Sequence, residues 1–303
     1  MVEAEAAAPA PHGLPTMRRI MTSRPNFVDQ WQRAAERNGS ALCVGLDPDP
    51  ARFPAPWTDD AHRLCDFCAA IVDATADLVC AYKPQIAYFA ALGAESQLER
   101  LIAHIRKAAP GVPVILDAKR GDIGATAEQY AREAFVRYDA DALTVSPYMG
   151  FDSIEPYLAY PERGLFVLCR TSNPGGADLQ MLPLGANDAT PGQPAQAETL
   201  YQRVARLAAG AWNRHGQNGL VAGATAPQDI ARIRAVAPDA PLLIPGIGAQ
   251  GGDLLATVRA ARHRYIVNAS RSVLYAGSGR DFADRARQEA QQLRTAIAQA
   301  AAQ

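Results

Sequence analysis

The sequence predicts an α/β fold, a single-domain (β/α)8 TIM barrel in which eight parallel strands close into a cylinder with helices around it. Two observations predict this fold. Short runs rich in Val, Ile and Leu recur eight times along the chain, and segments of helical composition alternate with them. The length of 303 residues also suits one barrel, since a single barrel domain uses about 250 residues.

The strands are expected in brief apolar runs, each with Gly, Pro or Asp near one end. Such runs are typical of strands that are buried on both faces of a parallel sheet. One of them alone is weak evidence, whereas eight in alternation with helices are much stronger. The expected strands span residues 41–46, 78–82, 112–116, 142–145, 165–168, 219–222, 242–244 and 265–267.

The helices are expected where Ala, Leu, Arg and Glu recur at helical spacing between the strands. Pro227 suits the first position of one helix, where a missing backbone N–H costs little. The expected helices span residues 59–75, 96–108, 125–138, 198–215, 227–237, 252–261 and 281–303. The alternative fold is an open doubly wound sheet, and the lack of a G-x-G-x-x-G motif after the first strand counts against it.

Residues 1–22 are expected to form a disordered extension ahead of a barrel domain of residues 23–303. The segment is rich in Ala and Pro and lacks the basic start and apolar run of a secretory signal. No run of 18 apolar residues predicts a membrane span. We therefore expect a cytoplasmic protein with no membrane partner.

The composition excludes some classes of function. The chain has 30 basic and 31 acidic residues, a net charge of −1, which argues against a strongly basic nucleic-acid-binding protein. Its five cysteines, an odd number, do not suggest a disulfide framework. Cys65 and Cys68 have C-x-x-C spacing without a second pair or a histidine cluster. We expect them to be buried small residues, and a metal or redox role is the alternative.

Charged residues follow the first three expected strands, at the end of a barrel where active sites lie. Asp117 and Lys119 are two residues apart, which places them on one face of an extended chain, and Asp122 follows at a helix start. With Lys83 and Asp47 they make a row of alternating charge. An opposite pair about 4 Å apart is worth about 4 kcal/mol at an effective dielectric of about 20. The row would fix Lys119 where it can donate a proton to a carbanion; a structural salt-bridge network, or a helix cap at Asp122, is the alternative.

Glycines follow the seventh expected strand, and an arginine follows the eighth. Gly246, Gly248, Gly251 and Gly252 allow backbone N–H groups to approach an anion, and Arg271 adds a positive charge. These two loops are the usual phosphate site of such barrels. The alternative is a glycine-rich turn beside a surface arginine.

A long loop of residues 172–196 follows the fifth expected strand and is rich in Pro and Gly. Its position at the catalytic end of the barrel favours a lid over the active site. The alternative is an insertion without a role in catalysis.

The chain resembles orotidine 5′-phosphate decarboxylases of the longer bacterial subgroup, type 2, over about residues 27–275. The resemblance rests on six segments, of which the third and fifth together are the most specific. They are LCVGLDPDP (42–50), KPQIAYF (83–89), DAKRGDIGAT (117–126), TSNPGG (171–176), IPGIGAQGG (244–252) and NASRSVL (268–274).

The resemblance implies decarboxylation of orotidine 5′-phosphate to UMP and CO2 in de novo pyrimidine biosynthesis, without a metal or organic cofactor. It implies that Lys119 protonates C6 of the pyrimidine and that Asp117 faces the departing carboxylate. Lys83 and Asp47 would lie on the ribose side.

The resemblance also implies a homodimer with shared active sites, into which each chain would donate Asp122, Ile123 and Thr126. The remaining implied contacts are with substrate. They are Ser172 at the pyrimidine, Gln250 and Arg271 at the phosphate with backbone N–H groups near Gly248 and Ser270, and Pro245 as a further substrate contact.

Two other functions fit parts of the pattern. A metal-dependent sugar-phosphate decarboxylase or aldolase-like barrel shares the D-x-K-x-x-D spacing, but a lysine at position 83 would repel the metal ion. A non-catalytic sensor of a phosphate ligand would need only the phosphate half of the site. The complete set of Asp and Lys residues therefore favours the decarboxylase.

Overall fold

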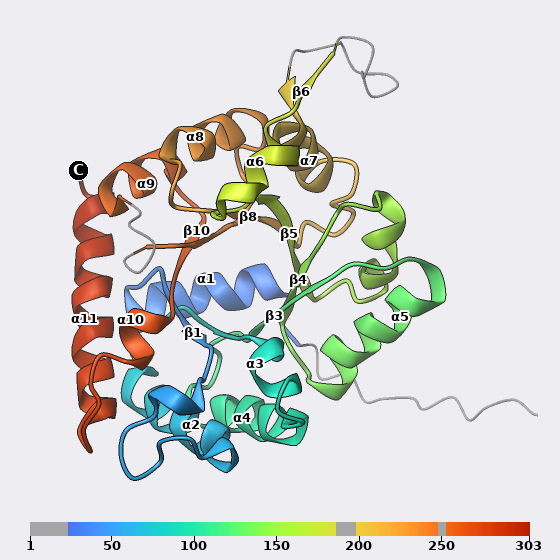
Figure 1. Cartoon of the computed structure of the whole chain (residues 1–303). Coiled ribbons are helices and arrows are strands. Elements are labelled where there is room, and N and C mark those ends of the chain that lie inside the picture. Colours follow the sequence, from blue (N-terminus) through green and yellow to red (C-terminus); the bar gives the residue numbers. More distant parts are fainter. Residues whose placement is uncertain (1–23, 186–197, 248–252) are drawn as a thin grey trace, which may run out of the picture.

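The computed structural model describes residues 24–185, 198–247 and 253–303, and its main sheet has eight strands (Figure 1). The strands pair in parallel and in chain order around the sheet. Parallel bridges from Tyr82 to Val114 and from Gln85 to Asp117 join the two outermost strands. The sheet is therefore a barrel, as predicted, and the open doubly wound sheet is excluded. The strands are β1 Leu42–Leu46, β2 Ala81–Pro84, β3 Ile115–Arg120, β4 Ala142–Val145, β5 Gly164–Arg170, β8 Asn218–Ala222, β9 Leu242–Pro245 and β10 Tyr265–Ala269.

All eight predicted strands exist, but two of them begin about three residues later than predicted. Leu78 and Val79 before β2, and Val112 and Val114 before β3, are buried although they lie outside the strands. Their apolar composition reflects burial in the hydrophobic core, and of the four only Val114 is joined to a neighbouring strand by an isolated bridge. Composition therefore locates a strand without locating the first residue of its hydrogen-bonded ladder.

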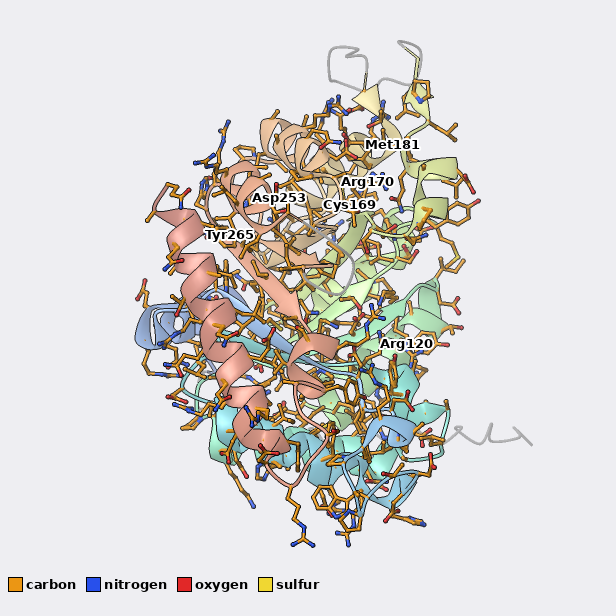
Figure 2. All side chains as sticks on the ribbon, turned by 60° about the vertical axis from the view of Figure 1, so that its left-hand side comes forward. Arg120, Cys169, Arg170, Met181, Asp253 and Tyr265 are labelled. Carbon is orange, nitrogen blue, oxygen red and sulfur yellow. The ribbon has the colours of Figure 1, made fainter. Side chains whose placement is uncertain are left out.

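The predicted helices also exist within the described residues, mostly with shorter bounds. They are α2 Leu64–Thr75, α4 Glu95–Ala108, α5 Gly124–Arg132, α7 Leu200–Ala209, α8 Pro227–Val236, α9 Leu254–Ala261 and α11 Phe282–Ala301. Helix α7 starts after Thr199, whose side chain and that of Gln202 form a capping box. The two residues before it, Glu198–Thr199, form strand β7, which pairs with β6, Pro183–Leu184. In Figure 2, α11 lies along the outside of the barrel, where it packs against α2 and α9.

Helix α1, Phe27–Asn38, was not predicted, and Figure 1 shows it crossing the centre of the barrel. Its buried residues Phe27, Val28 and Trp31 pack against the inward-facing residues of the strands. Gly164 makes room for this helix, because a Cβ there would lie 2.3 Å from the Phe27 ring. Helix α1 therefore fills one end of the barrel, and the functional groups gather at the other end.

Three shorter helices were also not predicted: α3 Ile86–Ala90, α6 Ala177–Gln180 and α10 Arg271–Leu274, which follow β2, β5 and β10. All five cysteines are buried and free, so the prediction for Cys65 and Cys68 is confirmed. No helix in the described part of the chain is long and apolar enough to cross a membrane. The predicted extension, residues 1–22, lies outside the described residues.

Candidate active site

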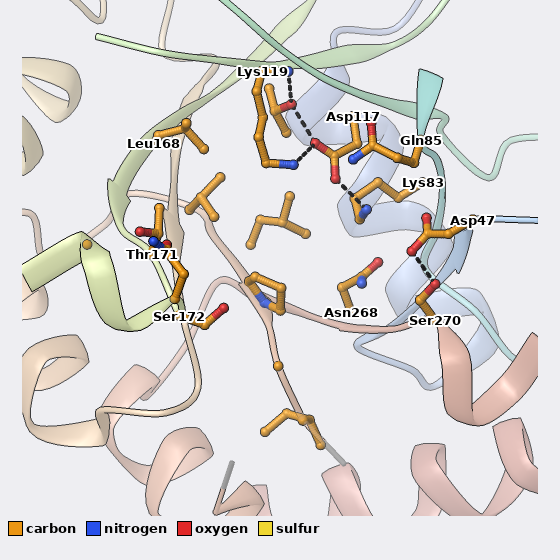
Figure 3. Close-up of a pocket in the computed structure, with 18 of the residues that line it drawn as sticks. Asp47, Lys83, Gln85, Asp117, Lys119, Leu168, Thr171, Ser172, Asn268 and Ser270 are labelled. Carbon is orange, nitrogen blue, oxygen red and sulfur yellow. Dashed lines mark hydrogen bonds and ion pairs between the residues drawn. The ribbon is translucent and has the colours of Figure 1, made fainter. Parts of the chain in front are cut away.

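A cavity of about 690 Å³ lies at the C-terminal ends of the strands (Figure 3). One side of it is polar and charged, with side chains from β1, β2, β3, β4 and β10. The other side carries apolar side chains from β5, β8 and β9. The predicted residues that line it are Asp47, Lys83, Asp117, Lys119, Ser172, Pro245, Ser270 and Arg271.

Asp117 lies between two ammonium groups at the floor of this cavity (Figure 3). Lys83 Nζ is 2.6 Å from Asp117 Oδ2, and Lys119 Nζ is 2.7 Å from Asp117 Oδ1. Burial alone would raise the pKa of Asp117, but the two lysines outweigh it and hold that pKa well below its usual range. Burial likewise opposes the charge of Lys83, but Asp117 and Asp47 outweigh burial and raise its pKa. Asp117 and Lys83 are therefore held in their charged forms, and Lys119 Nζ lies in ion-pair distance on the other side of the carboxylate.

The prediction that Asp117 and Lys119 face the same side is confirmed, but the reason given for it was wrong. The chain is not regularly extended there. Leu116 pairs with Leu143 and Arg120 with Val145, so β3 has three residues opposite one residue of β4. Lys119 has a φ of +45°, in the left-handed region. A bulge, rather than strand periodicity, brings both side chains to the cavity.

Asp47, which is predicted to lie on the ribose side, is held by Ser270, the residue that directly follows β10. The Ser270 hydroxyl donates a hydrogen bond to Asp47 Oδ2. This approach depends on Gly45, where a Cβ would lie 2.9 Å from the Ser270 Cβ. In the described part of the chain, Asp47 Oδ1 and Asn268 Oδ1 are buried and accept no hydrogen bond. Both residues line the cavity, so these oxygens are placed to accept hydrogen bonds from a ligand.

Ser172 lies in the segment after β5, and the close approach of Gly223, directly after β8, fixes its position. A Cβ on Gly223 would lie 2.8 Å from the Ser172 backbone nitrogen, so only a glycine allows the two segments to approach this closely. Gln180 in α6 accepts a hydrogen bond from the Thr171 N–H at 2.9 Å and donates one to its hydroxyl at 2.8 Å. Arg170, labelled in Figure 2, donates to Asp229 Oδ2 at 2.9 Å. Of the predicted lid, residues 186–196 lie outside the described residues.

The predicted phosphate end of the cavity is formed in part by described residues. Pro245 at the end of β9 and the following Gly246 and Ile247 line it, as do Ser270 and Arg271 after β10. Gly246 has a φ of +101°, which favours glycine. The predicted Gly248, Gln250, Gly251 and Gly252 lie outside the described residues.

Asp122, Ile123 and Thr126 do not line this cavity. Asp122 accepts a hydrogen bond from the Ile123 N–H at 2.8 Å, and Ile123 and Thr126 are exposed. Within the described residues Asp122 makes no ion pair with Lys119, so the expected row of charge does not include it in the single chain. The alternative role as a cap of α5 is also not met, because Ile123 occupies that position.

Sequence reasoning missed several polar residues of the cavity. They are Gln85, Thr144, Thr171, Asn173, Gln180 and Asn268. Thr144 and Asn268 lie inside strands, where a single polar residue resembles ordinary strand composition. The alternation of side chains along a strand could have identified them, since residues two apart on a strand share a face. No group of three His, Cys, Asp or Glu side chains that could hold a metal ion occurs in the described part of the chain.

Comparisons with known proteins show the family of the chain. A profile of the Orotidine 5′-phosphate decarboxylase / HUMPS family matches residues 40–292. An orotidine 5′-phosphate decarboxylase of Verminephrobacter eiseniae is 64% identical over 279 residues, which cover 91% of this chain and 99% of that protein. The structure of the OMP decarboxylase of Leishmania donovani has a TM-score of 0.73 and 39% identity, and the match covers 89% of this chain and 99% of that chain.

A longer protein contains a similar barrel. The UMP synthase of Leishmania donovani has a TM-score of 0.76 and 40% identity, and the match covers 91% of this chain but 57% of that chain. The present chain thus spans little more than half of that protein. The family profile covers most of this chain, and its relatives match over nearly their whole length. The chain therefore belongs to the orotidine 5′-phosphate decarboxylase / HUMPS family.

Proposed function

We propose that this chain is a carboxy-lyase that converts orotidine 5′-phosphate to UMP and CO2 in pyrimidine biosynthesis. The names of its close relatives support the substrate and the reaction. The observation that carries the proposal is the buried Asp117 carboxylate between Lys83 and Lys119 at the floor of the cavity. A carboxylate beside a proton-donating ammonium is suited to a reaction that expels one carboxyl group and protonates the carbon left behind.

The proposed reaction proceeds through a carbanion at C6 of the pyrimidine. The bond from C6 to the substrate carboxyl carbon breaks, CO2 leaves, and the electron pair stays on C6. The Lys119 ammonium stabilises this charge and transfers one proton to C6, and solvent then restores the proton to the lysine. Asp117 faces the departing carboxylate, and its own negative charge favours departure.

The nucleotide is proposed to lie across the cavity with its ends held by different strands. Arg271 and the backbone near Ser270 take the phosphate, and Asp47 and Lys83 take the ribose hydroxyls. Ser172 and Pro245 contact the pyrimidine. Binding energy at the phosphate end then aligns the pyrimidine with Lys119, although the phosphate takes no part in the chemistry. Gln250 and Gly248 belong to the same proposal as further phosphate contacts.

The reaction is proposed to need no metal ion and no organic cofactor. Lys83 supports this part, because its ammonium lies 2.6 Å from Asp117, where a metal-dependent relative would need a cation ligand. The site differs from that of a phosphate sensor for a similar reason. A sensor has no need of the two ion pairs that Asp117 makes with Lys83 and Lys119 in the same cavity.

The functional unit is proposed to be a homodimer with two shared sites. Asp122 and Thr126 lie outside the cavity of their own chain, next to exposed apolar side chains on the loops after β3 and β4. Ile123 is 49% exposed, Tyr148 80% and Met149 44%. A second copy of the chain would cover this apolar surface and would bring Asp122, Ile123 and Thr126 to its partner's cavity.

We also propose a cytoplasmic location, which five free cysteines support.

Two experiments test these proposals. The purified protein, treated with EDTA, is expected to convert orotidine 5′-phosphate to UMP at the rate of the untreated protein, followed by absorbance and by product chromatography. Absence of UMP would reject the activity, and a rate restored only by added metal would reject the cofactor-free reaction.

Mixing Lys119→Ala and Asp122→Ala chains is expected to restore activity, because one of the two sites in each hybrid is intact. Confirmed hybrids without activity would reject the shared site.

A further inference from the structure

Three hydrogen bonds converge on the hydroxyl of Thr144 in β4, a residue whose exposed fraction is 1%. Thr144 Oγ1 accepts from the Ala118 N–H at 3.0 Å and from the Lys119 N–H at 2.9 Å. It donates to Asp117 Oδ1 at 2.9 Å. Figure 3 shows Asp117, which accepts this bond, together with its two ion pairs to Lys83 and Lys119. A single hydroxyl thus contacts the three consecutive residues of the β3 bulge.

The bulge requires such a partner. Three residues of β3 lie opposite one residue of β4, so the N–H groups of Ala118 and Lys119 cannot both find carbonyls in the ladder. An N–H group that is partly shielded from water and has no acceptor is unfavourable. The left-handed backbone of Lys119 adds to this cost. The Thr144 hydroxyl offsets these costs, because it satisfies both N–H groups at once.

The direction of the third bond follows from the atoms available. A hydroxyl has one proton and two lone pairs, and the two N–H groups occupy both lone pairs. The remaining proton points at Asp117 Oδ1, which also accepts from Lys119 Nζ at 2.7 Å. Asp117 Oδ2 accepts from Lys83 Nζ at 2.6 Å. The hydroxyl therefore links the orientation of the carboxylate to the backbone that carries Lys119.

We propose that Thr144 is a positioning residue for the decarboxylation, which acts through Asp117 and Lys119. Its hydroxyl holds the bulge in the one shape that presents the Lys119 ammonium beside the Asp117 carboxylate. The proposal rests on the proposed function and extends it to a residue of the neighbouring strand. The proposed nucleotide-binding groups at Asp47 and Ser172 are held by other contacts, so Thr144 affects the chemical step rather than nucleotide affinity.

Replacement of the hydroxyl tests this proposal. Thr144→Val keeps the shape of the side chain but removes the donor and both acceptors. We expect kcat to fall at least 100-fold while the Kd for UMP changes less than threefold. Thr144→Ser restores the hydroxyl and is expected to recover kcat to within about tenfold of the original protein. The acid limb of the kcat profile should move to higher pH in Thr144→Val, because a carboxylate that loses a hydrogen-bond donor is protonated more easily.

Thr75→Val is the matched control, since Thr75 is also buried, and its hydroxyl donates to Ile71 O at 2.7 Å, in α2. Its kcat and pH profile are expected to be unchanged. If Thr144→Val does not fold, Thr144→Ala, which leaves room for a water molecule, replaces it in the same measurements. A kcat within threefold of the original protein, a rise in KM alone, or a serine variant as inactive as the valine variant would overturn the proposal. Failure of the unaltered protein to turn over substrate would instead reject the proposed function.

Discussion

The Lys83 ammonium lies 2.6 Å from the Asp117 carboxylate, and this ion pair joins β2 to β3 inside the barrel. The side chains of the two residues are 6% and 9% exposed, so water screens their attraction little. Lys119 binds the other oxygen of the same carboxylate at 2.7 Å. The stability of the protein and its proposed chemistry therefore depend on one set of charges.

The lowered pKa of Asp117 predicts a specific effect of acid on stability. A carboxylate with a depressed pKa in the folded protein stabilises the fold above the unfolded pKa of about 3.9, and this stabilisation is lost as the pH falls toward the folded value. Asp117→Asn removes this group. Below pH 4, its unfolding free energy should fall less steeply with pH than that of the original protein, by up to about 1.4 kcal/mol per pH unit.

Urea unfolding at half-unit steps from pH 5 to pH 3 measures this slope. Asp178→Asn is the control, because Asp178 is an exposed residue in the first turn of α6. Its slope should match that of the original protein. Equal slopes for Asp117→Asn and the original protein would mean that Asp117 is not held as a charged group in the fold.

The contact between Gly223 and Ser172 predicts the effect of one added methyl group. Gly223→Ala would place a Cβ 2.8 Å from the Ser172 backbone, so Ser172 must move away from β8. We expect UMP to bind at least tenfold more weakly by calorimetry, with the fold retained by circular dichroism. Gly175→Ala is the control. Gly175 lies in the segment that carries Ser172, and a Cβ there meets no atom closer than 3.8 Å. Unchanged affinity in Gly223→Ala would show that the position of Ser172 does not matter for nucleotide binding.

Arg234 does not line the cavity, and its replacement is expected to cause a large loss of stability. This arginine is 2% exposed, and its guanidinium donates to carbonyl oxygens of the loop before β9, of the end of α9 and of the loop before β10. Among them are Ala240 O at 2.6 Å and Ala261 O at 2.7 Å. Arg234→Met should lower the unfolding free energy by at least about 3 kcal/mol, because several buried carbonyls lose their donor together.

Arg234→Lys should not restore this stability, since a lysine has three donors on one atom and cannot reach two loops in the same geometry. Arg232→Met in the same helix is the control, because its side chain is 55% exposed, and only a small loss of stability is expected. Urea unfolding of the three variants decides this prediction. A loss for Arg234→Met no larger than that for Arg232→Met would contradict it.

The barrel could be predicted from the sequence because its strands are buried on both faces. Ile115 and Leu116, for example, are neighbours in β3 and are both fully buried. Strands of this kind appear in the sequence as continuous apolar runs. Helix α1 was missed although the sequence carries local signals for it. Asn26 caps its N-terminus by accepting a hydrogen bond from the Asp29 N–H, and Gly39 ends it in the left-handed conformation. Only the tertiary structure shows that Phe27, Val28 and Trp31 fill the open end of the barrel.

The charged part of the site could be predicted because lysine and aspartate are rarely buried without a function or a partner. The bulge could not be predicted, because it depends on the pairing of β3 with β4 and on the hydroxyl of Thr144. The expected place of Asp122 beside Lys119 was not met within one chain, because the segment after the bulge leads away from the cavity. Sequence spacing does not record such a turn of the backbone.

The central claim is that the Lys119 ammonium delivers the proton that completes decarboxylation. Lys119→Ala and the exposed control Lys107→Ala should be compared in single-turnover release of labelled CO2 from orotidine 5′-phosphate, with UMP affinity measured on the same samples. The account predicts that Lys119→Ala loses at least 1,000-fold in rate and still binds UMP, whereas Lys107→Ala matches the original protein. A Lys119→Ala variant that releases CO2 and forms UMP at the original rate would contradict it.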